Sequence, residues 1–271
     1  MKPLIIIRGG GDLATGIALR LHHVGFSITI LELDKPLAVR RTVSFSEAVY
    51  EGMQTVEGVI ARLVSADQFQ VAMEAGEISV LVDPQANILR NQFLTSPQST
   101  FVIDARLLKT EPEPLASDVA LHIGLGPGFS AGTNCHAVIE TQRSHTLGRV
   151  YWEGQAQEDS KQPDGDARRV LRAPANGNIE AVKAIGDFCK EGEKIAVINS
   201  VNSKQFSVVS PFDGLLRGLI HSKVDVTEGI KIGDVDSRND PNLIRLVSDK
   251  SLSVAGGVLE VVFTKLREME Y

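Results

Sequence analysis

The first third of the chain alternates short apolar runs with an amphipathic segment. Residues 4–8 form an apolar, β-branched run that stops at three glycines, and residues 27–31 form a second run. Between them, Leu13, Ile17 and Leu21 recur at helical spacing. A continuous apolar run is typical of a parallel strand buried on both faces. The pattern therefore predicts a strand, a glycine turn, a helix and a second strand.

The same alternation continues to about residue 139. Further buried strands are expected at residues 78–82 and 101–104, and a helix at residues 37–51. Strands that alternate with helices favour the α/β class. We therefore expect residues 1–145 to form a Rossmann-like, doubly wound nucleotide-binding domain.

The second half of the chain has short β-type segments separated by turns, and it contains an internal repeat. At one constant spacing, the matched pairs are Pro174 and Pro211, Gly177 and Gly214, Glu191 and Glu228, Gly192 and Gly229, and Lys194 and Lys231. A repeat of this kind needs its copy to complete a core. An apolar stripe from Leu252 to Leu266 predicts a final helix. We therefore expect residues 146–271 to form a β-rich domain, a two-fold β repeat that is barrel-sandwich-like, with a C-terminal helix.

Composition bears on the kind of partner and on the compartment to expect. The 271 residues carry 34 acidic and 28 basic side chains, for a net charge of −6, which does not favour nucleic acid as a partner. The apolar run at the start is too short to span a membrane and lacks a signal peptide's cleavage pattern. Two cysteines without a CxxC pair fit reduced thiols in a cytoplasmic protein.

The three glycines after the first strand belong to a G-x-G-x-x-A motif. Gly9 permits the tight turn, Gly11 lets the backbone approach a pyrophosphate, and Ala14 permits close packing of the helix. The free N–H groups at the helix start favour phosphate. Glu32 is available for a ribose, and Asp12 either caps the helix or faces the phosphates. The candidate ligand-binding residues here are Gly9, Gly10, Gly11, Asp12, Leu13, Ala14 and Glu32. The alternative is a glycine turn that only packs.

A second glycine-rich segment, residues 124–132, follows another strand-like run. Its backbone N–H groups suit an anion, with Gly126 and Gly128 as candidates, although a long structural turn would have the same composition. At the end of a predicted strand, Arg106 either clamps an anionic ligand or forms an ion pair with Asp104.

Two other features suggest little chemistry. Cys135, beside His136, is a candidate nucleophile, but adjacent strand residues point to opposite faces and a buried inert thiol is the commoner case. No zinc-ligand spacing is present, so no metal is expected. Lys204 lies between the β repeats, where biotinyl and lipoyl domains place their modified lysine, but its neighbours do not match such a site. The catalytic residues, if any, stay unknown.

Several strings together resemble one family. They are Ile7 to Gly16, Gly124 to Gly132, Val138 to Thr141, Leu147 to Val150, Arg217 to Ile220, Gly229 to Asp234 and Gly256 to Glu260. On these, the chain resembles the YqeB family of selenium-dependent molybdenum hydroxylase system proteins over essentially its whole length. It departs at Ser144-His145, where the family pattern would have Gly-His. The resemblance implies a cytoplasmic accessory factor for maturation of a molybdenum hydroxylase, with that enzyme or other maturation proteins as partners.

The ligand and the activity stay open at this point. The nucleotide site suits NAD(P), but such hydroxylases commonly carry a molybdopterin dinucleotide, which the same site would suit. One alternative function is an NAD-dependent oxidoreductase, although no Tyr-x-x-x-Lys or His–Asp pairing is evident beside the site. The other is a nucleotide-sensing binding module that recruits a partner through its β domain.

Overall fold

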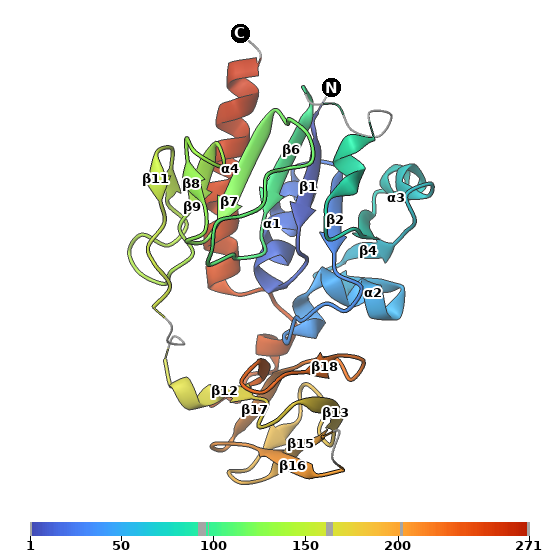
Figure 1. The fold of residues 1–271 in the computed structure, drawn as a ribbon, viewed down its shortest axis with the longest axis vertical. Helices are drawn as coiled ribbons and strands as arrows, with labels where there is room; N and C mark the ends of the chain where they lie inside the picture. Colours follow the sequence, from blue (N-terminus) through green and yellow to red (C-terminus); the bar gives the residue numbers. More distant parts are fainter. Residues whose placement is uncertain (1, 92–95, 97, 161–164, 201–202, 270–271) are drawn as a thin grey trace.

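The computed structural model describes residues 2–91, 96, 98–160, 165–200 and 203–269. It is a mixed α/β structure, as the sequence predicts, with one large sheet, a long terminal helix and several smaller antiparallel sheets. Figure 1 shows the large sheet and the terminal helix in one unit and the later β-strands in a second, smaller unit. Among the described residues, no helix combines the length and the apolar character that crossing a membrane requires.

The large sheet has nine strands in the order β10-β9-β7-β6-β1-β2-β5-β4-β3. The strands are β1 (Leu4–Arg8), β2 (Ile28–Glu32), β3 (Met53–Val56), β4 (Val59–Leu63), β5 (Ile78–Val82), β6 (Thr100–Asp104), β7 (Leu121–Leu125), β9 (Ala137–Ile139) and β10 (Val150–Tyr151). From β9 to β4 neighbouring strands are parallel, and β10 and β3 at the edges are antiparallel. β1 pairs with both β2 and β6, so the strand order reverses at β1 and a crevice is expected at the carboxyl ends there.

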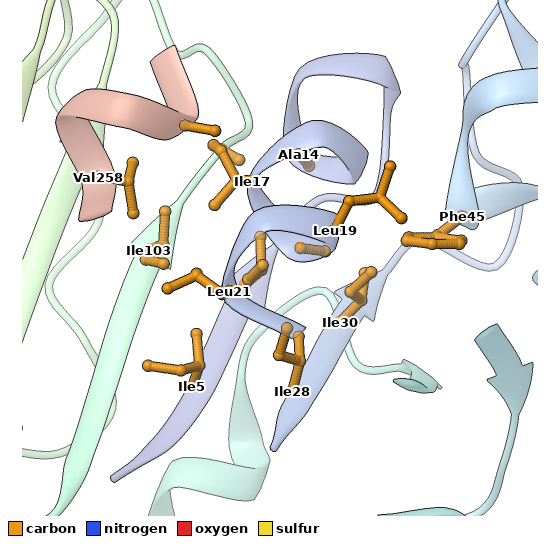
Figure 2. Close-up of a cluster of buried hydrophobic side chains, with 14 of the residues drawn as sticks. Ile5, Ala14, Ile17, Leu19, Leu21, Ile28, Ile30, Phe45, Ile103 and Val258 are labelled. Atoms are coloured by element: carbon orange, nitrogen blue, oxygen red, sulfur yellow. The ribbon is translucent and has the colours of Figure 1, made fainter. Parts of the chain in front are cut away.

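One face of the sheet carries α1 (Asp12–His23) and the terminal helix α4 (Asp249–Met269). Figure 2 shows Ile17 of α1 close to the sheet residue Ile103 and to Val258 of α4, all in one apolar cluster. The shorter α3 (Phe69–Glu74) contributes Phe69 to a separate apolar cluster with Ile6, whose side chain lies on the other face.

The predicted helix over residues 37–51 is wrong. The segment holds two 3-10 turns, η1 (Arg41–Val43) and η2 (Phe45–Glu47), and only a four-residue helix, α2 (Ala48–Glu51). The other 3-10 turns are η3 (Asn87–Arg90), η4 (Ala167–Arg169) and η5 (Pro241–Ile244). Tertiary contacts override helical propensity here because the segment packs against the start of α1, where the Phe45 N–H donates to Thr15 Oγ1 at 2.9 Å.

The terminal helix belongs to the core of the first unit, which differs from the expected boundary at residue 146. Its buried face, including Val254, Val258 and Val262, shares one apolar cluster with α1 and the large sheet. The Ser251 hydroxyl donates to the carbonyl of Asp12 at 2.8 Å and lies close to that of Leu13. The apolar stripe was visible in the sequence, but the pattern did not show which surface would cover it.

The second unit consists of two four-stranded antiparallel sheets, β12-β19-β17-β14 and β16-β15-β13-β18. Its strands are β12 (Val170–Arg172), β13 (Gly177–Ala181), β14 (Phe188–Cys189), β15 (Lys194–Asn199), β16 (Gln205–Val209), β17 (Gly214–Leu219), β18 (Asp225–Val226) and β19 (Lys231–Asp236). The matched repeats begin at β13 and β17, and each sheet takes a strand from the other repeat, since β14 pairs with β17 and β18 with β13. Neither repeat completes a sheet alone. A two-stranded sheet, β8 (Ser130–Ala131) with β11 (Gly154–Gln155), lies beside the large one.

Candidate functional site

The glycine turn after β1 is braced on one side. Gly9 has a φ of +86°, a conformation that favours glycine, and its N–H donates to the Leu31 carbonyl at 2.8 Å. The Gly10 N–H donates to Glu32 Oε1 at 2.5 Å. A Cβ at Gly10 would lie 2.9 Å from the backbone nitrogen of Ser46, so this side of the turn is covered by η2.

The other side of the turn is open at Gly11. A Cβ built there meets no atom within 4 Å. Gly11 is the N-cap of α1 without any side-chain cap, and within the described chain no acceptor is found for the backbone N–H groups of Gly11 and Asp12. Behind them Ala14 is buried in the core. An uncapped helix start with free N–H groups can bind an anion.

The Glu32 carboxylate holds the turn together in this structure. It is 8% exposed, and its second oxygen accepts from the Leu33 N–H at 2.8 Å. Burial raises the pKa of Glu32 above its usual range, against the lowering effect of hydrogen bonds from Gly10 and Leu33. Each oxygen therefore already accepts one backbone hydrogen bond, and the ribose contact stays a prediction.

The second glycine-rich segment lies beside the first and is shaped by close packing. Gly126 has a φ of +97°, and a Cβ at Gly128 would overlap the carbonyl oxygen of Thr110. A Cβ at Gly124 would overlap the ring of Phe129. Close packing is therefore enough to explain these glycines, and no ligand is needed to explain them. The segment does border the candidate site through Pro127.

A cleft of about 190 Å³ joins the two segments. Its lining residues are Leu13, Leu107, Lys109, Pro127, Thr141, Gln142, Arg143, Gln157, Glu158, Asp159, Ser160 and Lys250. Leu13 is in the first turn of α1 and Lys250 in the first turn of α4, so two helix starts border one cleft. Pockets for whole drug-sized ligands usually measure roughly 300–1,000 Å³, so this cleft suits only part of a dinucleotide.

The crevice at the carboxyl ends of β1 and β6 is filled by ion pairs. Arg106 binds the buried Asp104 at 2.6 Å and Glu113 at 2.7 Å, and Arg8 also contacts both carboxylates. Burial opposes ionisation of Glu113, but the hydrogen bonds from Arg106 and Arg8 lower its pKa to about 2. Of the two alternatives for Arg106, the structure shows the ion pair with Asp104.

Sequence reasoning missed a group of charged residues that comes from both units and includes a partner of the first turn of α1. Arg40 binds Asp12 at 3.1 Å, while Arg169, Arg217 and Lys231 surround Asp234. A Cβ built at Gly218, the neighbour of Arg217, would lie 3.2 Å from the Arg40 backbone nitrogen, so this part of the β unit packs against the residue that pairs with Asp12. No local motif could reveal this group, because its members come from separate segments of the chain.

The surroundings of Cys135 are those of an unreactive thiol. Cys135 is 8% exposed, and burial raises its pKa to about 11, so little thiolate forms near neutral pH. The neighbouring His136 does not activate it, because His136 Nδ1 accepts from the backbone N–H of His122 at 2.9 Å.

Glu47, Glu51 and His221 come within 4.8 Å of one another, close enough for a shared metal ion. The protein itself uses their donor atoms. His221 Nδ1 accepts from the Lys223 N–H, which leaves the proton of a neutral ring on Nε2, and Glu47 is paired with Arg41. The His221 ring stacks on Tyr50 with centroids 3.9 Å apart, so the group acts as a contact between the two units.

Comparison with known proteins gives one informative match. No protein-family model matches the chain. Among solved structures, an aspartoacylase family protein from Mesorhizobium loti has 10% identity and a TM-score of 0.26, covering 86% of this chain and 84% of its own. A succinylglutamatedesuccinylase/aspartoacylase from Rhodobacter sphaeroides has 11% identity and a TM-score of 0.29, covering 86% and 85%. Scores this low carry no argument about fold or activity.

The informative match is the uncharacterized protein YqeB of Escherichia coli strain K12. It is 41% identical over 280 aligned residues, which cover 99% of this chain and 50% of YqeB. The chain therefore spans about half the length of the curated relative. The chain is therefore similar along nearly its whole length to about half of YqeB.

Proposed function

We propose that this chain binds a nucleotide-type anion, a dinucleotide such as NAD(P) or a molybdopterin dinucleotide, by its phosphate groups at the start of α1. The observation that carries the proposal is the open space at Gly11, where an uncapped twelve-residue helix presents free N–H groups. Helix starts of this kind favour phosphate through both hydrogen bonding and the helix dipole.

The arrangement of the first unit supports this proposal. Its parallel strands reverse order at β1, the glycine turn joins β1 to α1, and Glu32 ends the adjacent β2, which is a Rossmann-like arrangement. The second unit, with its exchanged β strands, is barrel-sandwich-like in this proposal. We further propose that the ligand is handled during maturation of a molybdenum hydroxylase, in line with the resemblance of the sequence to the YqeB family.

Ligand-induced thermal stabilisation tests the site. Native mass spectrometry of the purified chain first distinguishes NAD(P) from a pterin dinucleotide. At a hundredfold excess over its dissociation constant, a ligand stabilises the folded state by about 2.7 kcal/mol. Gly11→Val should abolish this effect, because its side chain would occupy the phosphate position. The backbone of Gly11, at φ −66° and ψ −176°, accepts valine without strain.

Gly256→Val is the matched control, since Gly256 lies in α4 with no atom within 4 Å of a built Cβ. It should keep the full thermal shift. An equal shift in the Gly11→Val variant would refute the site.

A deletion strain tests the maturation role. Loss of the protein should leave the hydroxylase polypeptide present but inactive, with reduced selenium or cofactor content. The wild-type gene and Cys135→Ser should restore activity, because the buried thiol has no role in the proposed site, whereas Gly11→Val should not. Full hydroxylase activity in the deletion strain would contradict this role and favour the oxidoreductase alternative.

A further inference from the structure

We infer that the β unit completes the anion site, with Arg217 and Lys231 of this unit and Arg40 of the first unit forming a second phosphate subsite opposite the Gly11 turn. The ligand class is then a diphosphate, with one phosphate on the free N–H groups of α1 and the next on these cations. This inference rests on the proposed function and adds the residues that would select a diphosphate over a monophosphate.

Arg40 joins the two units at the start of α1. Its side chain is 8% exposed, with one nitrogen 3.1 Å from Asp12 Oδ2. Another donates to the carbonyls of Leu243 and Leu246, in the segment that leads from the β unit to α4. The guanidinium is thus held next to the first turn of α1 by contacts from both sides.

The β unit brings more positive than negative charge to this place. One buried carboxylate, Asp234, is shared by Arg169 at 2.7 Å, Arg217 at 2.6 Å and Lys231 at 3.7 Å. Arg217 also reaches Asp236 at 3.3 Å, but Asp236 is already bound by Arg238 at 2.7 Å. Carboxylates shared in this way leave the cations only partly neutralised.

Two buried N–H donors show that the carboxylates do not satisfy all the hydrogen-bond donors of these cations. In the described part of the chain, the Nε–H groups of Arg40 and Arg217 are buried and have no acceptor. Burial is the main cause that lowers the pKa of Arg40, and the positive charge of Arg217 lowers it further. Burial also lowers the pKa of Lys231, as do the charges of Arg169 and Arg217. A buried donor without an acceptor is destabilising, so an anion that accepted from it would be stabilised here.

Asp12 and Lys231 are the more exposed members of the group. The side chains of Asp12 and Lys231 are 35% and 39% exposed, while Asp234 is 1% exposed. A diphosphate entering beside Asp12 would meet the α1 N–H groups and the ammonium of Lys231 together. A single phosphate would meet only one of these two sets of donors.

Calorimetric titration of the full chain with inorganic pyrophosphate and with inorganic phosphate tests the inference. The wild type should bind pyrophosphate at least tenfold more tightly than phosphate. Lys231→Gln should remove that preference, weakening pyrophosphate tenfold or more while leaving phosphate nearly unchanged. Lys231 is partly exposed, so this variant should fold, and Lys231→Arg should restore the preference by returning the charge.

Lys194→Gln is the matched control, because Lys194 holds in the first repeat the position that Lys231 holds in the second, and it is exposed on the other sheet. It should bind as the wild type does. If Lys231→Gln keeps the pyrophosphate preference while Gly11→Val abolishes binding, the second subsite is refuted and the proposed function stands. If pyrophosphate binds neither the wild type nor any variant, or binds the Gly11→Val variant unchanged, both are refuted.

Discussion

Replacement of Gly16 by alanine tests whether the terminal helix is part of the first unit's core. Gly16 lies in α1 where α4 crosses it, and a built Cβ would overlap the hydroxyl of Ser251. That hydroxyl is fully buried and donates to the carbonyl of Asp12 at 2.8 Å. We expect Gly16→Ala to destabilise the protein, although alanine is the better helix former.

The expected magnitude follows from two opposing effects. Alanine in place of a helical glycine gains about 1 kcal/mol of helix propensity. Overpacking at a tight contact costs roughly 1–3 kcal/mol, and displacing the Ser251 hydroxyl from its acceptor costs roughly 1–3 kcal/mol more. The free energy of unfolding should therefore fall by about 1–5 kcal/mol. For a chain of this size each kcal/mol corresponds to about 2–4 °C in Tm.

Urea unfolding followed by circular dichroism measures the change, with Gly256→Ala as the control. Gly256 is an exposed glycine of α4 with free space around it, so the same substitution should stabilise the protein by about 0.5–1 kcal/mol. Ser251→Gly combined with Gly16→Ala should recover part of the loss, because the overlapping hydroxyl is gone. A Gly16→Ala variant as stable as the wild type would refute this packing of α4 on α1.

Two further predictions follow from buried groups. The buried His122 has its pKa lowered to about 4, mainly by burial, so between roughly pH 6.5 and 4 the unfolded state binds a proton that the folded state does not. The free energy of unfolding should therefore fall by about 3 kcal/mol as the pH falls through that window. In urea unfolding, His122→Phe should show a shallower decline, and the control His145→Gln, at an exposed position, should decline as the wild type does. Cys135 and Cys189 are both buried with raised pKa values, so they should react with a thiol reagent at pH 8 only after unfolding. Rapid labelling of the native protein would contradict their placement.

The sequence by itself determined the features that local patterns encode. Two short apolar runs, with a glycine turn and an apolar helical stripe between them, predicted β1, α1 and β2. The prediction was possible because backbone geometry sets the spacing of apolar residues along a strand and along a helix. The recurring Pro-x-x-Gly and Glu-Gly-x-Lys positions identified the two repeats of the β unit, since each copy places its turns at the same points. A Cβ built at Gly11 meets no atom within 4 Å, and ligand binding at this turn stays a prediction.

Only the tertiary structure decided where long-range partners lie. The stripe of α4 specified an apolar face but not its partner, and the structure places that face on α1 rather than on the β unit. The helix expected over residues 37–51 became 3-10 turns because the segment is used to cover the glycine turn. Arg40, Arg217 and Lys231 carry no local signal, since charges from separate segments meet only when two units pack and water is excluded between them.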